Sequence, residues 1–413
     1  MAEPPAVVIG LDSITGLQSA RILSARGVQV LGVVASRRHW GARTNACVEV
    51  LESPLHGEEL VRCLLEASGR IGRKCVLVPC NDASVEAVSL HRERLADRFL
   101  LALPPHEIVE LLMDKTRFAR HAAEQGLPVP RTEVLAGRTD AERVATGIGY
   151  PCVIKPPHKA PGWLAHTSAK ALTVHDAGEL LATYDEVAGW APRLLAQEWV
   201  EGPETGLYSC NAYFGDDGRP LATFVARKIR QWPPLVGTSA SGEECRDDEV
   251  RDTTVTLFGG LGFRGLAYLE MKRDVRTGRL VIIEPNVGRP TGRSAIAEAG
   301  GVELLHTAYC DIAGLPLPQA REQRYVGAKW IDLRRDLQAA LVARRQGALS
   351  LAGWARWVRG GPKAHAIWSA RDPKPFLVDL AHATGVGAHR LLGASRQPDL
   401  QLSQPVTAGR GMP

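Results

Sequence analysis

The 413-residue chain lacks the cysteine spacings that mark zinc sites and redox motifs. Its eight cysteines include no C-x-x-C pair and no zinc-ligand spacing. Most of them stand in apolar segments, so we expect small buried hydrophobic residues of a reduced protein. A catalytic thiol is an alternative for Cys80, which ends an expected strand, but reactivity would require a lowered thiol pKa.

Long apolar runs and concentrated charge are also missing. No stretch of 18 apolar residues occurs, which argues against a transmembrane helix. The first five residues carry an acid and no basic group, unlike the start of a secretory signal. The net charge of +5 forms no basic stripe of the kind that binds nucleic acid, although it suits anionic substrates such as nucleotides. We therefore predict a cytoplasmic protein that binds neither nucleic acid nor membranes.

Strand-like and helix-like segments alternate through the first hundred residues, as expected of an α/β protein with a parallel sheet. Strands are expected at residues 6–9, 28–34, 46–51, 75–79 and 99–103. Helices are expected at residues 17–26, 57–68 and 83–96. The pattern predicts a doubly wound N-terminal domain over residues 1–113.

The first strand–helix turn lacks a dinucleotide fingerprint. It runs from Gly10 to Gly16 without a middle glycine, and no acid ends the second strand, so nicotinamide binding is disfavoured. The carboxyl ends of parallel strands still form ligand crevices. Four polar residues follow the first and fourth strands and are candidate substrate ligands: Asp12, Ser13, Asn81 and Asp82.

Two alternating apolar runs, 266–274 and 280–286, are joined by a turn-rich connector and predict a β-hairpin. Glu270 and Glu284 lie on its strands, and Asn286 falls two residues beyond Glu284, on the same face of an extended chain. Two carboxylates and an amide oxygen on adjacent strands are ligands that Mg²⁺ prefers.

This Glu–Glu–Asn trio resembles the magnesium site of the ATP-grasp superfamily. The D-K-x-x-F element from Asp114 to Phe118 also matches, and the likeness extends over roughly residues 1–315. It implies an ATP-grasp fold of two α+β subdomains over residues 114–315, with a lid subdomain at about 128–196. It further implies that Lys115 and Lys155 face the phosphates of ATP, and that the trio holds two Mg²⁺ ions, with Mn²⁺ as an alternative.

Residues 194–204 resemble the hinge that binds adenine in this superfamily. The likeness implies that backbone groups of Glu198, Trp199 and Val200 pair with the adenine edge. Either Glu201 or Glu204 would accept hydrogen bonds from the ribose, and the sequence leaves the choice open. Residues 156–170 correspond to the loop that closes over the triphosphate.

A basic cluster follows the predicted hairpin of residues 208–226. Three cations within four residues, at what looks like a strand end, suggest binding of phosphate or a substrate carboxylate; a solvated edge with protective charges is the alternative. The catalytic candidates are Lys228, Arg230 and Arg289, the last by analogy with an arginine that follows the Asn in many relatives. The further substrate candidates are Arg227, Thr238, Ser239 and Arg293.

The nearest likeness is to carboxylate–amine ligases close to D-aspartate ligases, carried by residues 227–234 and 283–292. It implies an enzyme that joins a small-molecule carboxylate to an amine, an amino acid or peptide, through an acylphosphate, with release of ADP and phosphate. A bicarbonate-activating carboxylase, a non-catalytic nucleotide-binding module and a homodimeric assembly remain open. Residues 316–395 are predicted to form a C-terminal extension and 396–413 a disordered tail.

Overall fold

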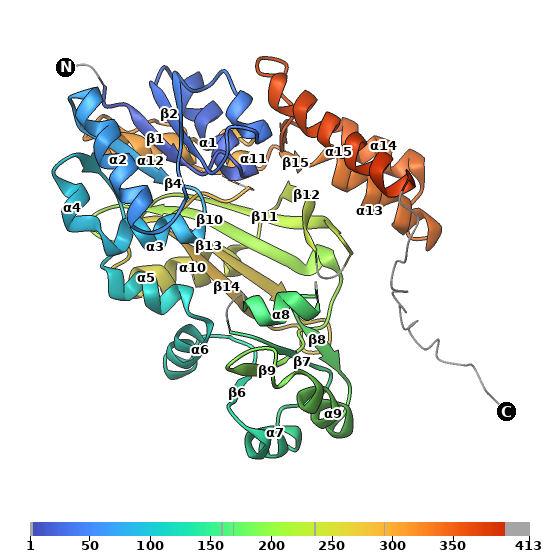
Figure 1. Ribbon diagram of the computed structural model, residues 1–413. Helices are drawn as coiled ribbons and strands as arrows, with labels where there is room; N and C mark the ends of the chain where they lie inside the picture. Colours follow the sequence, from blue (N-terminus) through green and yellow to red (C-terminus); the bar gives the residue numbers. More distant parts are fainter. Residues whose placement is uncertain (1–2, 158–159, 168, 235–236, 293, 393–413) are drawn as a thin grey trace.

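The structure is a computed structural model that describes residues 3–392 except 158–159, 168, 235–236 and 293 (Figure 1). Arg293 and the predicted tail at 396–413 therefore lie outside the described residues. Three β-sheets organise the chain. No helix within the described ranges has the length and apolar character needed to cross a membrane.

The N-terminal sheet is parallel, with the strand order β3-β2-β1-β4-β5. Its strands are β1 (Ala6–Ile9), β2 (Val30–Val34), β3 (Glu49–Glu52), β4 (Cys75–Pro79) and β5 (Phe99–Leu100). Helices α1 (Ile14–Ala25), α2 (Gly57–Ile71), α3 (Asp82–Leu90) and α4 (Arg92–Ala96) connect them, with the short 3₁₀ helix η1 (Trp40–Arg43) before β3. Val7 and Ile9 pack toward α2 and α3, whereas Ala6 and Val8 pack toward α1. Helices thus cover both faces, as the doubly wound prediction required.

A four-stranded antiparallel sheet forms a separate body at the bottom of Figure 1. Its order is β6-β9-β7-β8: β6 (Thr132–Leu135), β9 (Leu194–Glu198), β7 (Cys152–Lys155) and β8 (Leu172–Val174). Helices α7 (Arg138–Ala145), α8 (Pro161–His166) and α9 (Ala177–Val187) belong to it, and α5 (His106–Met113) and α6 (Lys115–Glu124) lead into it. Its apolar side chains form their own cluster, which includes the buried Trp163.

The central sheet has seven strands in the order β14-β13-β10-β11-β12-β15-β16. They are β10 (Leu207–Phe214), β11 (Pro220–Trp232), β12 (Thr238–Glu244), β13 (Gly265–Arg273), β14 (Leu280–Val287), β15 (Lys329–Ile331) and β16 (Lys363–His365). The remaining elements are η2 (Glu204–Gly206), α10 (Asp248–Gly260), α11 (Ser294–Ala299), α12 (Leu304–Ile312), α13 (Leu333–Arg345), α14 (Leu351–Arg359) and α15 (Lys374–Leu392).

The C-terminal segment is continuous with the central sheet. Ser241 of β12 pairs with Ile331 of β15, so residues beyond 316 contribute two strands to it. Helices α13, α14 and α15 lie together beside that end of the sheet (Figure 1). Asp372, just before α15, accepts a hydrogen bond from Arg21 at 2.9 Å and thereby ties this segment to the N-terminal sheet.

Candidate active site

The predicted metal hairpin is present as the antiparallel pair β13–β14. Glu270 stands directly opposite Glu284, and Tyr268 stands opposite Asn286. Just beyond Glu270 the register shifts, because Met271 pairs with Ile282 and leaves Ile283 without a partner. This bulge turns Glu284 and Asn286 away from the core, although Ile282, two residues before Glu284, packs within it. The two carboxylates and the amide therefore share one face.

The polar surroundings of these three residues differ. Lys228 donates to Glu270 at 2.9 Å, and the Tyr268 hydroxyl donates to its other oxygen at 2.8 Å. Asn286 accepts from the Arg289 guanidinium. Glu284 has no hydrogen-bond partner within the described part of the chain, which leaves its oxygens available to a hard cation.

No group of three or more His, Cys, Asp or Glu residues with metal-binding geometry occurs among the described residues. A site on this hairpin therefore needs the Asn286 amide oxygen beside the two carboxylates. Three oxygen ligands of this kind, completed by waters and substrate phosphates, are suited to Mg²⁺. They are less suited to softer metals, which prefer nitrogen or sulfur ligands.

Lys155 belongs to the four-stranded sheet and is influenced by the charge of Glu284 on this hairpin. It ends β7, is half-buried, and donates to Gln197 at 2.6 Å. Burial and the charge of Lys115 lower the pKa of Lys155 to about 8, and the Glu284 carboxylate opposes the shift. The charges of Lys115 and Glu284 both act on Lys155, although the three residues come from α6, β7 and β14. Two cations and a carboxylate so arranged suit a metal-bound polyphosphate.

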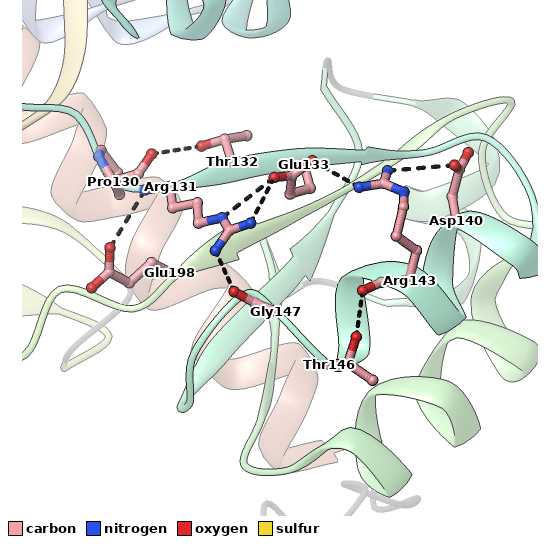
Figure 2. A network of polar contacts seen from close by, with 9 residues as sticks. All are labelled: Pro130, Arg131, Thr132, Glu133, Asp140, Arg143, Thr146, Gly147 and Glu198. Carbon is pink, nitrogen blue, oxygen red and sulfur yellow. Dashed lines mark hydrogen bonds and ion pairs between the residues drawn. The ribbon is translucent and has the colours of Figure 1, made fainter. Parts of the chain in front are cut away.

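The hinge amides are not all available to a nucleobase. The amide of Glu198 donates to Arg131 O at 2.9 Å, and that of Trp199 donates to Pro151 O at 3.1 Å. Figure 2 shows the Glu198 side chain beside Arg131. The Glu198 carboxylate accepts a hydrogen bond from the Arg131 backbone amide, and the Arg131 guanidinium donates to Glu133. The backbone bonds of Glu198 and Trp199 occupy two amides but not the backbone carbonyls, so the expectation that backbone groups of Glu198, Trp199 and Val200 pair with the adenine edge stays a prediction. The amide of Val200 donates no backbone bond in the described chain.

The acids proposed for the ribose have protein partners. Glu204 accepts the Gln231 amide at 2.8 Å. Glu201 lies 3.8 Å from Arg276, which reaches over from the β13–β14 turn and also approaches Glu198 at 3.6 Å. Sequence reasoning missed Arg276, because nothing in a turn sequence indicates that it meets a hinge some 75 residues earlier.

The four predicted polar residues follow β1 and β4, but two of them cap helices. Ser13 accepts the Gly16 amide at the start of α1, and Asn81 accepts the Ser84 amide at the start of α3. Asp82 pairs with Arg289 at 2.6 Å. One oxygen of Asp12 accepts the Ala35 amide, and its other oxygen is buried with no partner among the described residues.

The basic cluster does not stand at a strand end. Strand β11 continues to Trp232, so all three cations lie inside a long strand. Arg227 is paired with Glu243 at 2.6 Å, which raises the Arg227 pKa. Of the three side chains, Lys228 is the one bonded to the metal hairpin.

Arg230 is held by the C-terminal segment. Its Nε and Nη2 donate to the two oxygens of Asp336 on α13, at 2.7 and 3.0 Å, and its guanidinium lies 4.7 Å from the Trp357 ring centroid. Asp336 is fully buried. Thr238 of β12 likewise meets this segment, through Arg335, while Ser239 pairs with Gln231 of β11. The expected role of Arg230 in gripping a substrate is therefore replaced by a structural one.

The alternative of a catalytic Cys80 is also wrong. Burial raises the pKa of the Cys80 thiol to about 12, so the thiolate is not formed at neutral pH. All eight cysteines are free. Five of them are buried, as expected, whereas Cys47, Cys63 and Cys245 are half-buried.

No family model matches this chain. It is 24% identical over 189 residues to a D-alanine–D-alanine ligase of Pseudomonas putida and 21% identical over 257 residues to a D-aspartate ligase of Enterococcus faecium. These matches cover 43% and 59% of this chain and only 54% and 60% of the relatives' length.

Solved structures give the same fold. The biotin carboxylase domain of the Hydrogenobacter thermophilus 2-oxoglutarate carboxylase, solved with MgADP and bicarbonate, aligns with a TM-score of 0.61 at 16% identity. That match covers 79% of this chain and 73% of the domain. The chain has the ATP-grasp fold. Its sequence is similar to D-alanine–D-alanine and D-aspartate ligases over about half of the chain.

Proposed function

We propose that the protein is an ATP-dependent ligase that joins a small-molecule carboxylate to an amine. The observation that carries the proposal is the cross-strand pair of Glu270 and Glu284, which shares one face with Asn286 and whose Glu284 carboxylate acts electrostatically on Lys155 of another sheet. Two carboxylates on one sheet, with a cation on another sheet that feels the charge of one of them, suit a metal-bound triphosphate. The likeness to D-alanine and D-aspartate ligases supports amide formation.

Glu270, Glu284 and Asn286 are the residues that would hold Mg²⁺, and the ion would neutralise charge on the phosphate oxygens. Lys155 and Lys115 contribute fixed positive charge at the same end of the site. Lys228, which donates to Glu270, would orient that carboxylate and offer a hydrogen-bond donor to the transferred phosphoryl group.

In the proposed reaction a substrate carboxylate oxygen attacks the γ-phosphorus, and the bond to the ADP oxygen breaks. The amine then attacks the acyl carbon, phosphate leaves, and the amine nitrogen loses a proton. Such chemistry depends on positioning and charge neutralisation more than on a nucleophilic side chain. That requirement agrees with the protonated state of Cys80.

The substrates would bind where the N-terminal crevice meets the hairpin. Arg289 connects the two, because it donates to Asp82 of α3 and to Asn286 of β14. The buried free oxygen of Asp12 suits an ammonium group, since a buried acceptor without a partner is costly. An amino-acid substrate would carry an ammonium group for Asp12 and a carboxylate group for Arg289.

The proposal is tested by screening amino-acid pairs for phosphate release from ATP, with mass spectrometry of the product. We expect one pair to give ADP, phosphate and a product whose mass is the sum of both substrates less one water. Turnover that requires bicarbonate in place of an amine would identify a carboxylase. ATP binding without turnover by any carboxylate and amine would identify a non-catalytic module.

A further inference from the structure

Lys272 is a buried cation that the proposed reaction does not yet use. It lies on β13, two residues after Glu270, and only 9% of the residue is exposed. Leu269 and Met271 pack into the core, so Glu270 and Lys272 share the opposite face of this regularly paired strand. Lys272 therefore projects into the same space as the candidate metal ligand.

The surroundings of Lys272 belong to the hinge. Its Nζ lies 5.0 Å from the centroid of the Trp199 ring. A Cβ built on Gly202 would stand 3.6 Å from Lys272 Cε, so the lysine stem runs directly beside the hinge backbone. Asp274, two residues beyond Lys272 and just after the end of β13, attracts the ammonium most strongly; Lys228 repels it, and the carboxylates of Glu201 and Glu204 in the hinge also attract it.

Lys272 makes no hydrogen bond or ion pair within the described ranges of the chain, although its stem is held in place. A buried ammonium without a hydrogen-bond acceptor reduces stability, and packing against an aromatic face offsets only part of that cost. The missing element is an acceptor between Lys272 and the acids of the hinge. A sugar hydroxyl could fill this position, because one hydroxyl can accept a hydrogen bond from the Lys272 ammonium and donate one to a carboxylate of the hinge.

We propose that Lys272 is a ribose-binding residue, whose ammonium donates to a hydroxyl of the nucleotide sugar while Glu201 or Glu204 accepts that hydroxyl's proton. The inference rests on the proposed binding of ATP and names a residue that selects the sugar. Lys155 and Lys115 act at the phosphates, so sugar recognition and phosphate recognition depend on different lysines.

The experiment is calorimetric titration of the full chain with ATP, 2′-deoxy-ATP and 3′-deoxy-ATP in the presence of Mg²⁺. We expect the wild-type protein to bind one deoxy nucleotide about tenfold more weakly than ATP, the loss expected for one charge-assisted hydrogen bond. In Lys272→Met, ATP should bind as weakly as that deoxy nucleotide. Lys155→Met, the matched control, should weaken all three nucleotides and keep the preference for ribose.

Three outcomes would overturn the assignment of Lys272. In the first, the wild-type protein binds ATP and both deoxy nucleotides equally well. In the second, Lys272→Met keeps the preference for ribose. In the third, Lys155→Met loses that preference as well. A wild-type protein that binds no nucleotide would instead overturn the proposed function itself. Because the decisive quantity is a ratio measured within one protein, a general loss of stability in a variant does not imitate the expected result.

Discussion

The position of Lys155 in the candidate site leads us to expect that nucleotide affinity depends on pH. The pKa of its ammonium is lowered to about 8 by burial and by Lys115, so the free protein loses this charge above that pH. A bound triphosphate would favour the charged form and raise the pKa again. Nucleotide binding above pH 8 must then take up a proton, and affinity must fall as the pH rises.

We therefore expect ATP affinity to fall by up to about tenfold per pH unit between pH 8 and 10. Titrations at pH 8.5 in two buffers of different ionisation enthalpy should show proton uptake on binding. Lys155→Met should bind ATP more weakly at pH 7 and lose most of this proton uptake. Uptake that persists in Lys155→Met would show that another group is responsible.

At the scale of elements, the contact between β11 and α13 joins the C-terminal segment to the central sheet. Arg230 and Asp336 form a bidentate pair in which the carboxylate is fully buried, and Trp354 donates to the same carboxylate at 2.8 Å. Removal of one partner from a buried pair leaves the other charge without compensation.

We predict that Arg230→Met lowers the free energy of unfolding by about 3–5 kcal/mol. Arg246→Met, which breaks the exposed pair with Asp248, should cost less than about 1 kcal/mol. Urea unfolding of both variants measures the difference. ATP affinity of the folded Arg230→Met protein should stay near the wild-type value. Normal stability with a selective loss of ligation would restore Arg230 to the substrate site.

Several strands and helices could be predicted from patterns of neighbouring residues in the sequence. Alternating apolar residues and turn signals gave the N-terminal parallel sheet and the β13–β14 hairpin, because these depend on neighbours in sequence. The bulge at Ile283 was not predictable, since it appears only when β14 is paired with β13. The partners of Arg227 and Arg230 lie 16 and 106 residues away, so a cluster of charges in sequence could not reveal them. The two-residue spacing of Glu270 and Lys272 was a local signal that could have indicated Lys272.

At the scale of the whole molecule, the candidate site is assembled from all three sheets. The parallel sheet contributes Asp82, the four-stranded sheet contributes Lys155, and the central sheet contributes Glu270 and Glu284. No one of these sheets contains the complete set of charges. The account therefore depends on a metal–nucleotide complex that binds where the sheets meet.

Binding of the Mn²⁺ complex of ADP, followed by the paramagnetic signal of the ion, tests this claim most directly. Glu284 is the right residue to change, because its charge acts on Lys155 and its carboxylate has no hydrogen-bond partner among the described residues. We predict that the wild-type protein binds ADP at least about tenfold more tightly with Mn²⁺ than without it, and that Glu284→Gln removes this gain. Glu186→Gln, on the exposed face of α9, should behave as wild type. Equal metal dependence in the wild-type protein and Glu284→Gln would contradict the assignment of the metal site.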